Sequence, residues 1–362
     1  MGTPSVAPVP PPRLPAPTAT ASVAPGGLAV LSVRGNLLLR GVQPFHFHGV
    51  NRDTLEWGTF NWGGCGSDGH FTDVDFATVA AWNVNVVRIP LSQANWFGRR
   101  CDPGSYKQAI DAAVAKAHKR GMYVILDLHW SDIGGQAPCD SGCRSGQQPM
   151  PDADSIPFWQ QVATRYGGDP GILFDLYNEP HDVPWACWRN GGCSVQSSTV
   201  SPATGTPVAY MAVGMQQLYN VVRAAAPSSV VLVGGLDWAY DLSGIGNGYA
   251  LAGTNIVYAT HVYTQWHSTA SDWSAHFGYL TATYPVMATE FGSIDCSATI
   301  TKELIDYFDA PGGIAGNRMG WAIWSWNSPG ECSQPTVLAD WNGTPLAGQG
   351  QLIHDRLRTY RL

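Results

Sequence analysis

The sequence carries little charge for its length. Asp, Glu, Lys and Arg make up 13% of its 362 residues, against about 25% in an average soluble protein. Hydrophobic residues reach 44%, which indicates a folded protein with a sparsely charged surface and not a disordered chain. The net charge is −7 and no cluster of basic residues occurs, which argues against nucleic acid or an anionic membrane as partner. No apolar run approaches ~18 residues, so no transmembrane helix is expected.

Several catalytic and ligand-binding motifs are also missing. No G-x-G-x-x-G directly follows a predicted strand, so a dinucleotide-binding fold lacks its signature. The absence of G-x-S-x-G excludes a serine esterase of the α/β-hydrolase type. Neither H-E-x-x-H nor paired C-x-x-C elements occur, and His46 and His48 have no third metal ligand at a suitable spacing. We therefore predict no metal site and no cofactor.

The cysteines indicate disulfides. Eight of them lie in Gly- or Pro-rich stretches, and such an even number is typical of an exported protein. Closeness in sequence favours the pairs Cys139–Cys143, Cys187–Cys193, Cys65–Cys101 and Cys296–Cys332. The alternative is a set of free, buried thiols. We predict a secreted, extracellular protein whose surface loops are clipped by disulfides.

The chain divides into a linker and one large domain. Residues 1–26 are rich in Pro, Ala and Thr and contain a single charged residue, Arg13, which predicts a disordered linker. Residues 27–362 are long enough for a domain of barrel size. A linker of this kind usually tethers a second module.

Short apolar strands alternate with amphipathic helices along the domain. Residues 28–50 read as a small hairpin that leads into the first strand. The predicted strands are 45–50, 84–89, 123–128, 172–177, 230–233, 256–259, 286–288 and 321–326. The predicted helices are 106–120, 158–166, 208–225, 273–284, 299–309 and 351–360, and residues 234–253 show little helical pattern. This order predicts an α/β fold, a (β/α)8 TIM barrel, with a doubly wound open sheet as the alternative.

Polar and aromatic residues stand where the predicted strands end. Residues 172–177 form an apolar strand that stops before Pro180 and leaves Glu179 at the start of the loop. The C-terminal ends of parallel barrel strands meet at one mouth, which carries the chemistry of barrel enzymes. Singly, each of these residues could be structural, but together they indicate a site. The set is Arg88, His129, Trp130, Asn178, Glu179, His261, Tyr263, Glu290 and Trp324.

Two carboxylates in this set, Glu179 and Glu290, suggest cleavage of a glycosidic bond. That reaction needs a protonated acid at the leaving oxygen and an ionised carboxylate at the anomeric carbon. A separation of ~5–5.5 Å gives retention of configuration and ~6.5–9.5 Å gives inversion. The sequence alone leaves this choice open.

The motifs at the strand ends resemble those of glycoside hydrolase family 5. They are N-V-V-R-I-P (85–90), I-L-D-L-H-W (125–130), L-Y-N-E-P (176–180), H-V-Y (261–263), T-E-F-G (289–292) and W-S-W (324–326). Within the family the chain is most similar to the bacterial cellulases, the endo-β-1,4-glucanases. The resemblance covers residues 28–362, which is all but the linker.

The resemblance implies that Glu179 is the acid/base and Glu290 the nucleophile of a retaining enzyme. Other residues would hold the nucleophile or line the reacting subsite: Arg88 and Tyr263 would keep Glu290 ionised, Asn178 would bind the 2-hydroxyl, and His129, His261 and Trp324 would surround the sugar. Trp326, two residues further on, could take the part of Trp324. We also expect the negative charge of Glu290 to raise the pKa of Glu179.

The expected partner is a β-glucan polysaccharide or oligosaccharide, bound by a monomer. The 15 Trp and 14 Tyr suit a surface that stacks on sugar rings, and some of the tryptophans in the loops, at 57, 62, 96, 185, 188, 238 and 266, would serve as subsites. A carbohydrate-binding module is the expected neighbour of the linker. The alternatives are activity on β-mannan, mixed-linkage glucan or xyloglucan, and a non-catalytic carbohydrate-binding barrel.

Overall fold

Eight parallel strands close into a barrel. The computed structural model describes residues 27–57, 68–131, 147–200, 206–310, 319–328 and 335–360, so the predicted linker lies outside the described residues. Each strand pairs with its neighbours in the order β10-β11-β12-β13-β4-β5-β6-β7. The strands are β4 (His48–Asn51), β5 (Val86–Ser92), β6 (Tyr123–Trp130), β7 (Ile172–Asp175), β10 (Val231–Gly234), β11 (Ile256–Tyr263), β12 (Val286–Gly292) and β13 (Gly320–Ile323). The predicted (β/α)8 barrel is confirmed.

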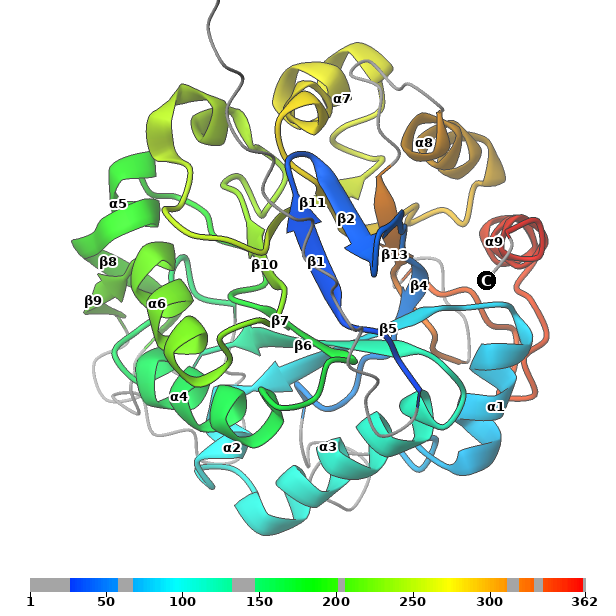
Figure 1. The fold of residues 1–362 in the computed structure, drawn as a ribbon, viewed down its shortest axis with the longest axis horizontal. Helices are drawn as coiled ribbons and strands as arrows, with labels where there is room; N and C mark the ends of the chain where they lie inside the picture. The colour runs from blue at the N-terminus through cyan, green and yellow to red at the C-terminus, as the bar shows by residue number, and fades with distance from the viewer. Residues whose placement is uncertain are drawn as a thin grey trace, which may run out of the picture.

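Helices surround the barrel as an outer ring (Figure 1). The strands β5, β6 and β12 are buried along their whole length, which explains their near-continuous apolar sequences. The helices of the described residues are α1 (Asp73–Ala81), α2 (Gln93–Trp96), α3 (Pro103–His118), α4 (Ser155–Tyr166), α5 (Trp185–Asn190), α6 (Met215–Ala225), α7 (Ala270–His276), α8 (Ala298–Asp309) and α9 (Gln349–Leu357), with the shorter η3 (Ile245–Tyr249) and η4 (Gly278–Ala282). The predicted helix 273–284 is thus split between α7 and η4.

A small antiparallel sheet closes the N-terminal end of the barrel. It consists of β1 (Leu31–Arg34), β2 (Leu37–Arg40) and β3 (Gln43–Pro44), and it lies across the barrel in Figure 1. Leu31 and Leu38 belong to one buried cluster with the inward-facing Ile125 and Leu232. The predicted hairpin is confirmed, and it leaves the opposite end of the barrel free for a site.

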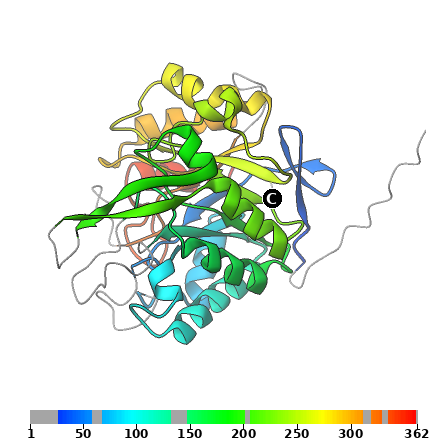
Figure 2. The same ribbon diagram turned by 90° about the vertical axis from the view of Figure 1, so that its left-hand side faces the viewer.

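One predicted helix is partly wrong. Residues 208–225 were expected to be helical, but α6 begins only at Met215, and Pro207–Val213 form the strand β9. Strand β9 pairs with β8 (Gly191–Val200) as an antiparallel ribbon, which Figure 2 shows at the end of the barrel away from the N-terminal sheet. Residues 207–213 form a strand because their burial alternates with a period of two: Tyr210 is buried while Met211 is exposed. We call β8 and β9 the mouth ribbon.

The described residues test part of the predicted disulfide pattern. Cys187 and Cys193 are bonded, as predicted. Cys101 and Cys296 also take part in disulfides, and their predicted partners lie outside the described residues, as does the pair Cys139–Cys143.

Among the described helices, none combines the length and the apolar character that crossing a membrane requires.

Candidate active site

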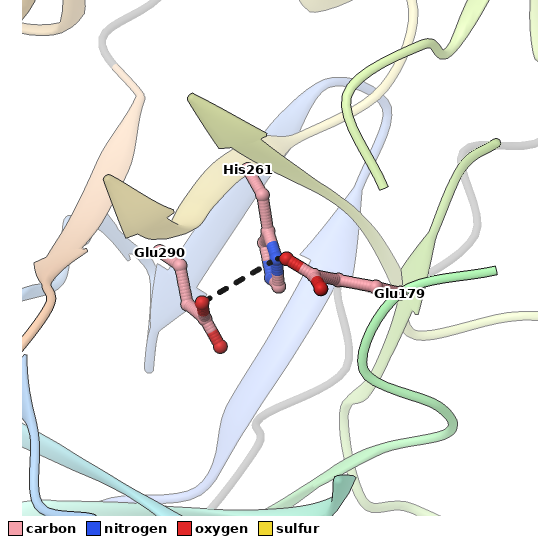
Figure 3. A group of neighbouring side chains, drawn as sticks. All are labelled: Glu179, His261 and Glu290. Atoms are coloured by element: carbon pink, nitrogen blue, oxygen red, sulfur yellow. Dashed lines mark hydrogen bonds and ion pairs between the residues drawn. The ribbon is translucent and has the colours of Figure 1, made fainter. Parts of the chain in front are cut away.

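Glu179 and Glu290 face each other across the mouth of the barrel (Figure 3). Glu179 follows strand β7, and Glu290 lies near the end of β12. His261, on β11, lies between them: its Nδ1 is 2.8 Å from Oε1 of Glu179 and 3.7 Å from Oε2 of Glu290. A carboxylate oxygen of Glu179 lies within 4.8 Å of one of Glu290. The two carboxylates, far apart in sequence, therefore belong to one site.

Two donors hold the carboxylate of Glu290. Arg88 donates from Nη1 to Oε1 at 2.6 Å, and the Tyr263 hydroxyl donates to Oε2 at 2.9 Å. Glu290 is 3% exposed. Hydrogen bonds to a carboxylate from a guanidinium are short and strong, so this geometry holds the Glu290 carboxylate in a fixed position at the floor of the mouth.

Arg88 is fully buried and forms ion pairs with three carboxylates. Besides Glu290, it contacts Asp127 and Asp175, each at 3.0 Å. Burial raises the pKa of Asp127 and of Asp175 to about 7, against the opposing charge of Arg88. Burial alone would lower the pKa of Arg88, but these carboxylates raise it, so the guanidinium stays charged.

Replacing Arg88 by methionine is expected to destabilise the fold by about 3–5 kcal/mol near neutral pH, because a buried cluster of carboxylates loses its cation. The loss should be smaller at pH 5 than at pH 8. Arg88 opposes the rise in the pKa of Asp127 and Asp175, so its removal should raise both pKa values above the wild-type value of about 7. A carboxyl group with a raised folded pKa loses stability as the pH rises from its unfolded to its folded pKa, so the variant should go on losing stability above about pH 7, where the wild type no longer does. Denaturant unfolding at both pH values measures this.

Arg165→Met is the matched control, because Arg165 pairs with Asp111 at the surface. Its loss should cost less than about 1 kcal/mol. A cost for Arg88→Met that is equally small, or that does not change with pH, would contradict the assigned electrostatic role.

Glu179 accepts a hydrogen bond at each oxygen. Oε1 pairs with His261, and Oε2 accepts from Nε2 of Gln147 at 2.6 Å. Burial raises the pKa of Glu179, while the Gln147 hydrogen bond acts against this rise. The raised pKa was expected, but its main cause is burial and not the charge of Glu290. A carboxyl group with a raised pKa keeps its proton to a higher pH than usual, which suits a general acid.

The two histidines of the site are buried and neutral. Burial lowers the pKa of His129 to about 4 and that of His261 to about 3. Nδ1 of His129 lies 2.7 Å from Asp127, and Nε2 of His261 lies 3.0 Å from Oγ1 of Thr289. These second contacts fix each imidazole ring in position.

An aromatic ring borders the site beside His129. Trp324 stacks on His129 with ring centroids 5.5 Å apart and planes 15° apart, and it is partly exposed. Trp326 is buried and packs edge-on against Trp82. Of the two tryptophans considered from the sequence, Trp324 is therefore the one that can touch a ligand.

The structure also adds residues that the strand-end pattern did not single out. Asn51, on β4, accepts from Nη1 of Arg88 at 3.0 Å. Gln147 bridges Glu179 and Asn178, whose Nδ2 donates to Oε1 of Gln147 at 3.1 Å. Asn51 stands in G-V-N-R-D (49–53), and Gln147 begins Q-Q-P-M-P-D-A-D (147–154). Both stretches also resemble the family, but the sequence assigned neither residue a role.

The candidate loop tryptophans fall into three groups. Trp96 and Trp188 are core residues, and Trp130 is also buried, against Trp57. Trp238 and Trp266 are 46% and 72% exposed. They stand on neighbouring loops, since Asp237 and His267 approach within 3.9 Å. Trp57 and Trp185 are partly buried, and Trp62 lies outside the described residues.

Glu179, His261 and Glu290 are close enough to be considered as metal ligands, since one ligand atom of each lies within 4.8 Å of the others. Their donors argue against it. Glu290 is already held by Arg88 and Tyr263, and a guanidinium beside a cation would repel it. The arrangement fits a proton-exchanging carboxyl group beside a fixed carboxylate better than metal binding. Of the histidine pair considered from the sequence, His46 and His48, the second stacks on Tyr360.

Comparisons with known proteins identify the family to which the chain belongs. Residues 42–330 match the family model "Cellulase (glycosyl hydrolase family 5)". Curated relatives include Endoglucanase Z of Dickeya dadantii, 24% identical over 66% of this chain and 46% of its own, and Endoglucanase E-5 of Thermobifida fusca, 23% identical over 88% of this chain and 61% of its own. The chain thus spans about half to three-fifths of the length of these relatives.

A solved structure has the same fold. The β-glucanase SdGluc5_26A of Saccharophagus degradans superposes with a TM-score of 0.69 at 23% identity, over 95% of this chain and 97% of its own. The family model covers most of the residues, including every strand of the barrel. The chain therefore belongs to the cellulase family, glycosyl hydrolase family 5.

Proposed function

We propose that this protein is a secreted, retaining glycoside hydrolase that cleaves internal β-1,4-glucosidic bonds of cellulose or a related β-glucan. One observation carries the mechanism: carboxylate oxygens of Glu179 and Glu290 lie within 4.8 Å of each other. A separation of this size suits the ~5–5.5 Å of retaining enzymes better than the ~6.5–9.5 Å that inverting enzymes need to place a water.

In the first step Glu290 attacks the anomeric carbon. The C–O bond to the leaving sugar breaks as Glu179 gives its proton to the leaving oxygen, and a covalent glycosyl-enzyme forms. Arg88 and Tyr263 hold the attacking carboxylate in place. The raised pKa of Glu179 keeps more of it protonated for this step.

In the second step Glu179 acts as the base. It takes a proton from a water molecule, whose oxygen attacks the anomeric carbon and releases Glu290. Esterification has removed the charge of Glu290, so the pKa of Glu179 falls and ionised Glu179 is favoured at that moment. Asn178 would bind the 2-hydroxyl, and His129, His261 and Trp324 would surround the same sugar.

The substrate class is supported by the relatives and by exposed rings. The Saccharophagus degradans β-glucanase was solved in complex with cellotetraose. Trp238 and Trp266 offer exposed indole faces of the kind that stack on pyranose rings. β-Mannan, mixed-linkage glucan and xyloglucan remain alternatives, because the loops and not the catalytic groups would distinguish them.

Proton NMR of the freshly released sugar tests retention and substrate together. We expect cello-oligosaccharides to give the β-anomer first, and reducing-sugar release to be highest on β-glucans in a panel that includes mannan and xyloglucan. Initial release of the α-anomer would contradict the double displacement. Binding to the polymers without any product would instead favour a non-catalytic carbohydrate-binding barrel.

Export is a separate part of the proposal. The bonded cysteines Cys101, Cys187, Cys193 and Cys296 support it, because disulfides persist in oxidising compartments. We also propose a monomer that acts beside a carbohydrate-binding module joined through the linker.

A further inference from the structure

Gln147 connects the two halves of the proposed catalytic machinery. Its Nε2 donates to Oε2 of Glu179 at 2.6 Å, and its Oε1 accepts from Nδ2 of Asn178 at 3.1 Å. Asn178 in turn accepts from Nη2 of Arg88 at 2.9 Å, and Arg88 also holds Glu290. The donors of these three hydrogen bonds all point the same way, from Arg88 through Asn178 and Gln147 to the carboxylate of Glu179.

The direction of this chain fixes the orientation of both amides. Arg88 can only donate, so the oxygen of Asn178 must face it and the Asn178 amide nitrogen must face Gln147. Because the Asn178 nitrogen donates, the oxygen of Gln147 must face it, and the nitrogen of Gln147 therefore faces Glu179. Because each group is polarised by its predecessor, the last hydrogen bond is strengthened, and it favours the ionised form of Glu179.

The backbone next to Gln147 is held by the mouth ribbon and by the end of β7. The Tyr210 hydroxyl accepts from the amide of Met150 at 3.1 Å and donates to its carbonyl at 2.7 Å. Ser198 donates its backbone N–H to Oε1 of Gln148 at 2.8 Å, and the Tyr177 hydroxyl donates to the carbonyl of Gln148 at 2.8 Å. Val213 donates to the carbonyl of Pro151 at 2.9 Å. These contacts leave the segment that carries Gln147 little freedom.

We propose that Gln147 is a positioning residue for the acid/base and that the mouth ribbon holds it in place. This inference rests on the proposed function, because it assigns Gln147 a part in the chemistry of Glu179. Gln147 competes with the proton for Oε2, the oxygen that His261 leaves free. It therefore stabilises Glu179 as the base of the second step and must release Oε2 when Glu179 carries the proton of the first.

Other groups also face Glu179, and the test has to separate them from Gln147. Those from the surrounding strands and loops are Arg88, Asp127, His129, His181, His261, Tyr263 and Glu290. Gln147→Leu leaves all of them in place and removes the donor to Glu179 together with the acceptor of the Asn178 amide. Gln147→Glu adds a like charge at the same position, and Gln160→Leu makes the same change as the first variant at an exposed site on α4.

The first measurement is a carbon-13 NMR titration of the glutamate carboxyl groups, with Glu179 assigned from the Glu179→Gln spectrum. In Gln147→Leu we expect the pKa of Glu179 to rise by about one unit, the size of a lost charge-assisted hydrogen bond. It should rise further in Gln147→Glu, and it should not change in Gln160→Leu. An unchanged Glu179 titration in Gln147→Leu would overturn the inference.

The second measurement is the pH profile on a cello-oligosaccharide. The alkaline limb of kcat/KM reports the acid form of Glu179, so it should move to higher pH by the same amount in Gln147→Leu. On a substrate with an activated leaving group, whose second step limits the rate, kcat should fall about tenfold while KM does not rise. A change in KM alone would mean that Gln147 only binds sugar and would also overturn the inference.

Tyr210→Phe tests the part of the mouth ribbon. It removes the two hydrogen bonds to Met150 without touching the site, and it should reproduce part of the Gln147→Leu titration shift. Tyr307→Phe, which loses a hydrogen bond to Ser274 in the outer layer, should not. If neither variant changes the titration, the ribbon has no such role.

Failure of this inference can be told from failure of the proposed function. If the wild-type protein hydrolyses no β-glycan, the proposed function fails, and the NMR titration still decides whether Gln147 controls Glu179. If the wild type is active and Glu179→Gln is inactive, the proposed function stands. If the titration of Glu179 in Gln147→Leu then equals that in the wild type, only the assignment of Gln147 is wrong.

Discussion

Glu290→Gln is expected to lower kcat by on the order of 10⁴-fold or more on every substrate, as loss of a nucleophile does in other enzymes. The amide is nearly isosteric with the carboxylate but cannot form the glycosyl-enzyme. Unlike loss of the acid, loss of the nucleophile should affect activated and unactivated leaving groups equally. The measurement is kcat on a cello-oligosaccharide and on 2,4-dinitrophenyl β-cellobioside.

Glu303→Gln is a suitable control for this variant. Glu303 lies exposed on α8, so the same chemical change there should leave both rates as in wild type. Thermal unfolding of Glu290→Gln should show that the fold persists, because the amide oxygen can still accept from Arg88 while the amide nitrogen donates to the Tyr263 hydroxyl. A folded variant that keeps more than about a tenth of wild-type turnover would refute the nucleophile.

Glu179 variants should show a different pattern, governed by the leaving group. Without the acid, the rate on unactivated glucans should fall by about 10²–10⁴-fold. Dinitrophenolate leaves without a proton, so the first step on 2,4-dinitrophenyl β-cellobioside should be nearly unaffected, and the glycosyl-enzyme should accumulate because the base is missing. A burst of dinitrophenol followed by slow turnover is therefore expected for Glu179→Ala.

Azide gives this prediction its sharpest test. In Glu179→Ala the anion fits the space that the carboxylate vacates and needs no base, so it should restore turnover and yield β-cellobiosyl azide. In Glu179→Gln the amide fills that space and rescue should be weak. Rescue without the β-azide, or no rescue at all in Glu179→Ala, would argue that Glu179 is not the acid/base.

Much of the fold follows from local sequence pattern. Strands such as β6 and β12 are short apolar runs bounded by turns, and their polar ends place His129 and Glu290 at one rim of the barrel. The mouth ribbon was missed because Pro207–Val213 precedes a true helix and shares its apolar content, while its period of two became clear only beside β8. The pairing between β8 and β9 separates this strand from the helix that follows it, and the apolar content of residues 207–213 alone does not reveal that pairing.

The site was predictable to the extent that its residues stand at strand ends. Gln147 does not: its stretch, Q-Q-P-M-P-D-A-D (147–154), resembles the family, but its role depends on a chain of three hydrogen bonds that only the folded protein creates. The cause of the raised pKa of Glu179 also required the structure. Two acids at the mouth suggested repulsion by Glu290, whereas burial of the Glu179 carboxyl is the main cause.

Covalent trapping tests the central claim that two glutamates act as one catalytic pair. A 2-fluoro-β-cellobioside with an activated leaving group slows the second step, so the glycosyl-enzyme should accumulate and the protein mass should rise by one fluorinated cellobiosyl group. Peptide mass spectrometry should place this group on Glu290, in a stoichiometric adduct that Glu290→Gln does not form. A label on any other residue, or complete loss of activity without a covalent adduct, would contradict the account.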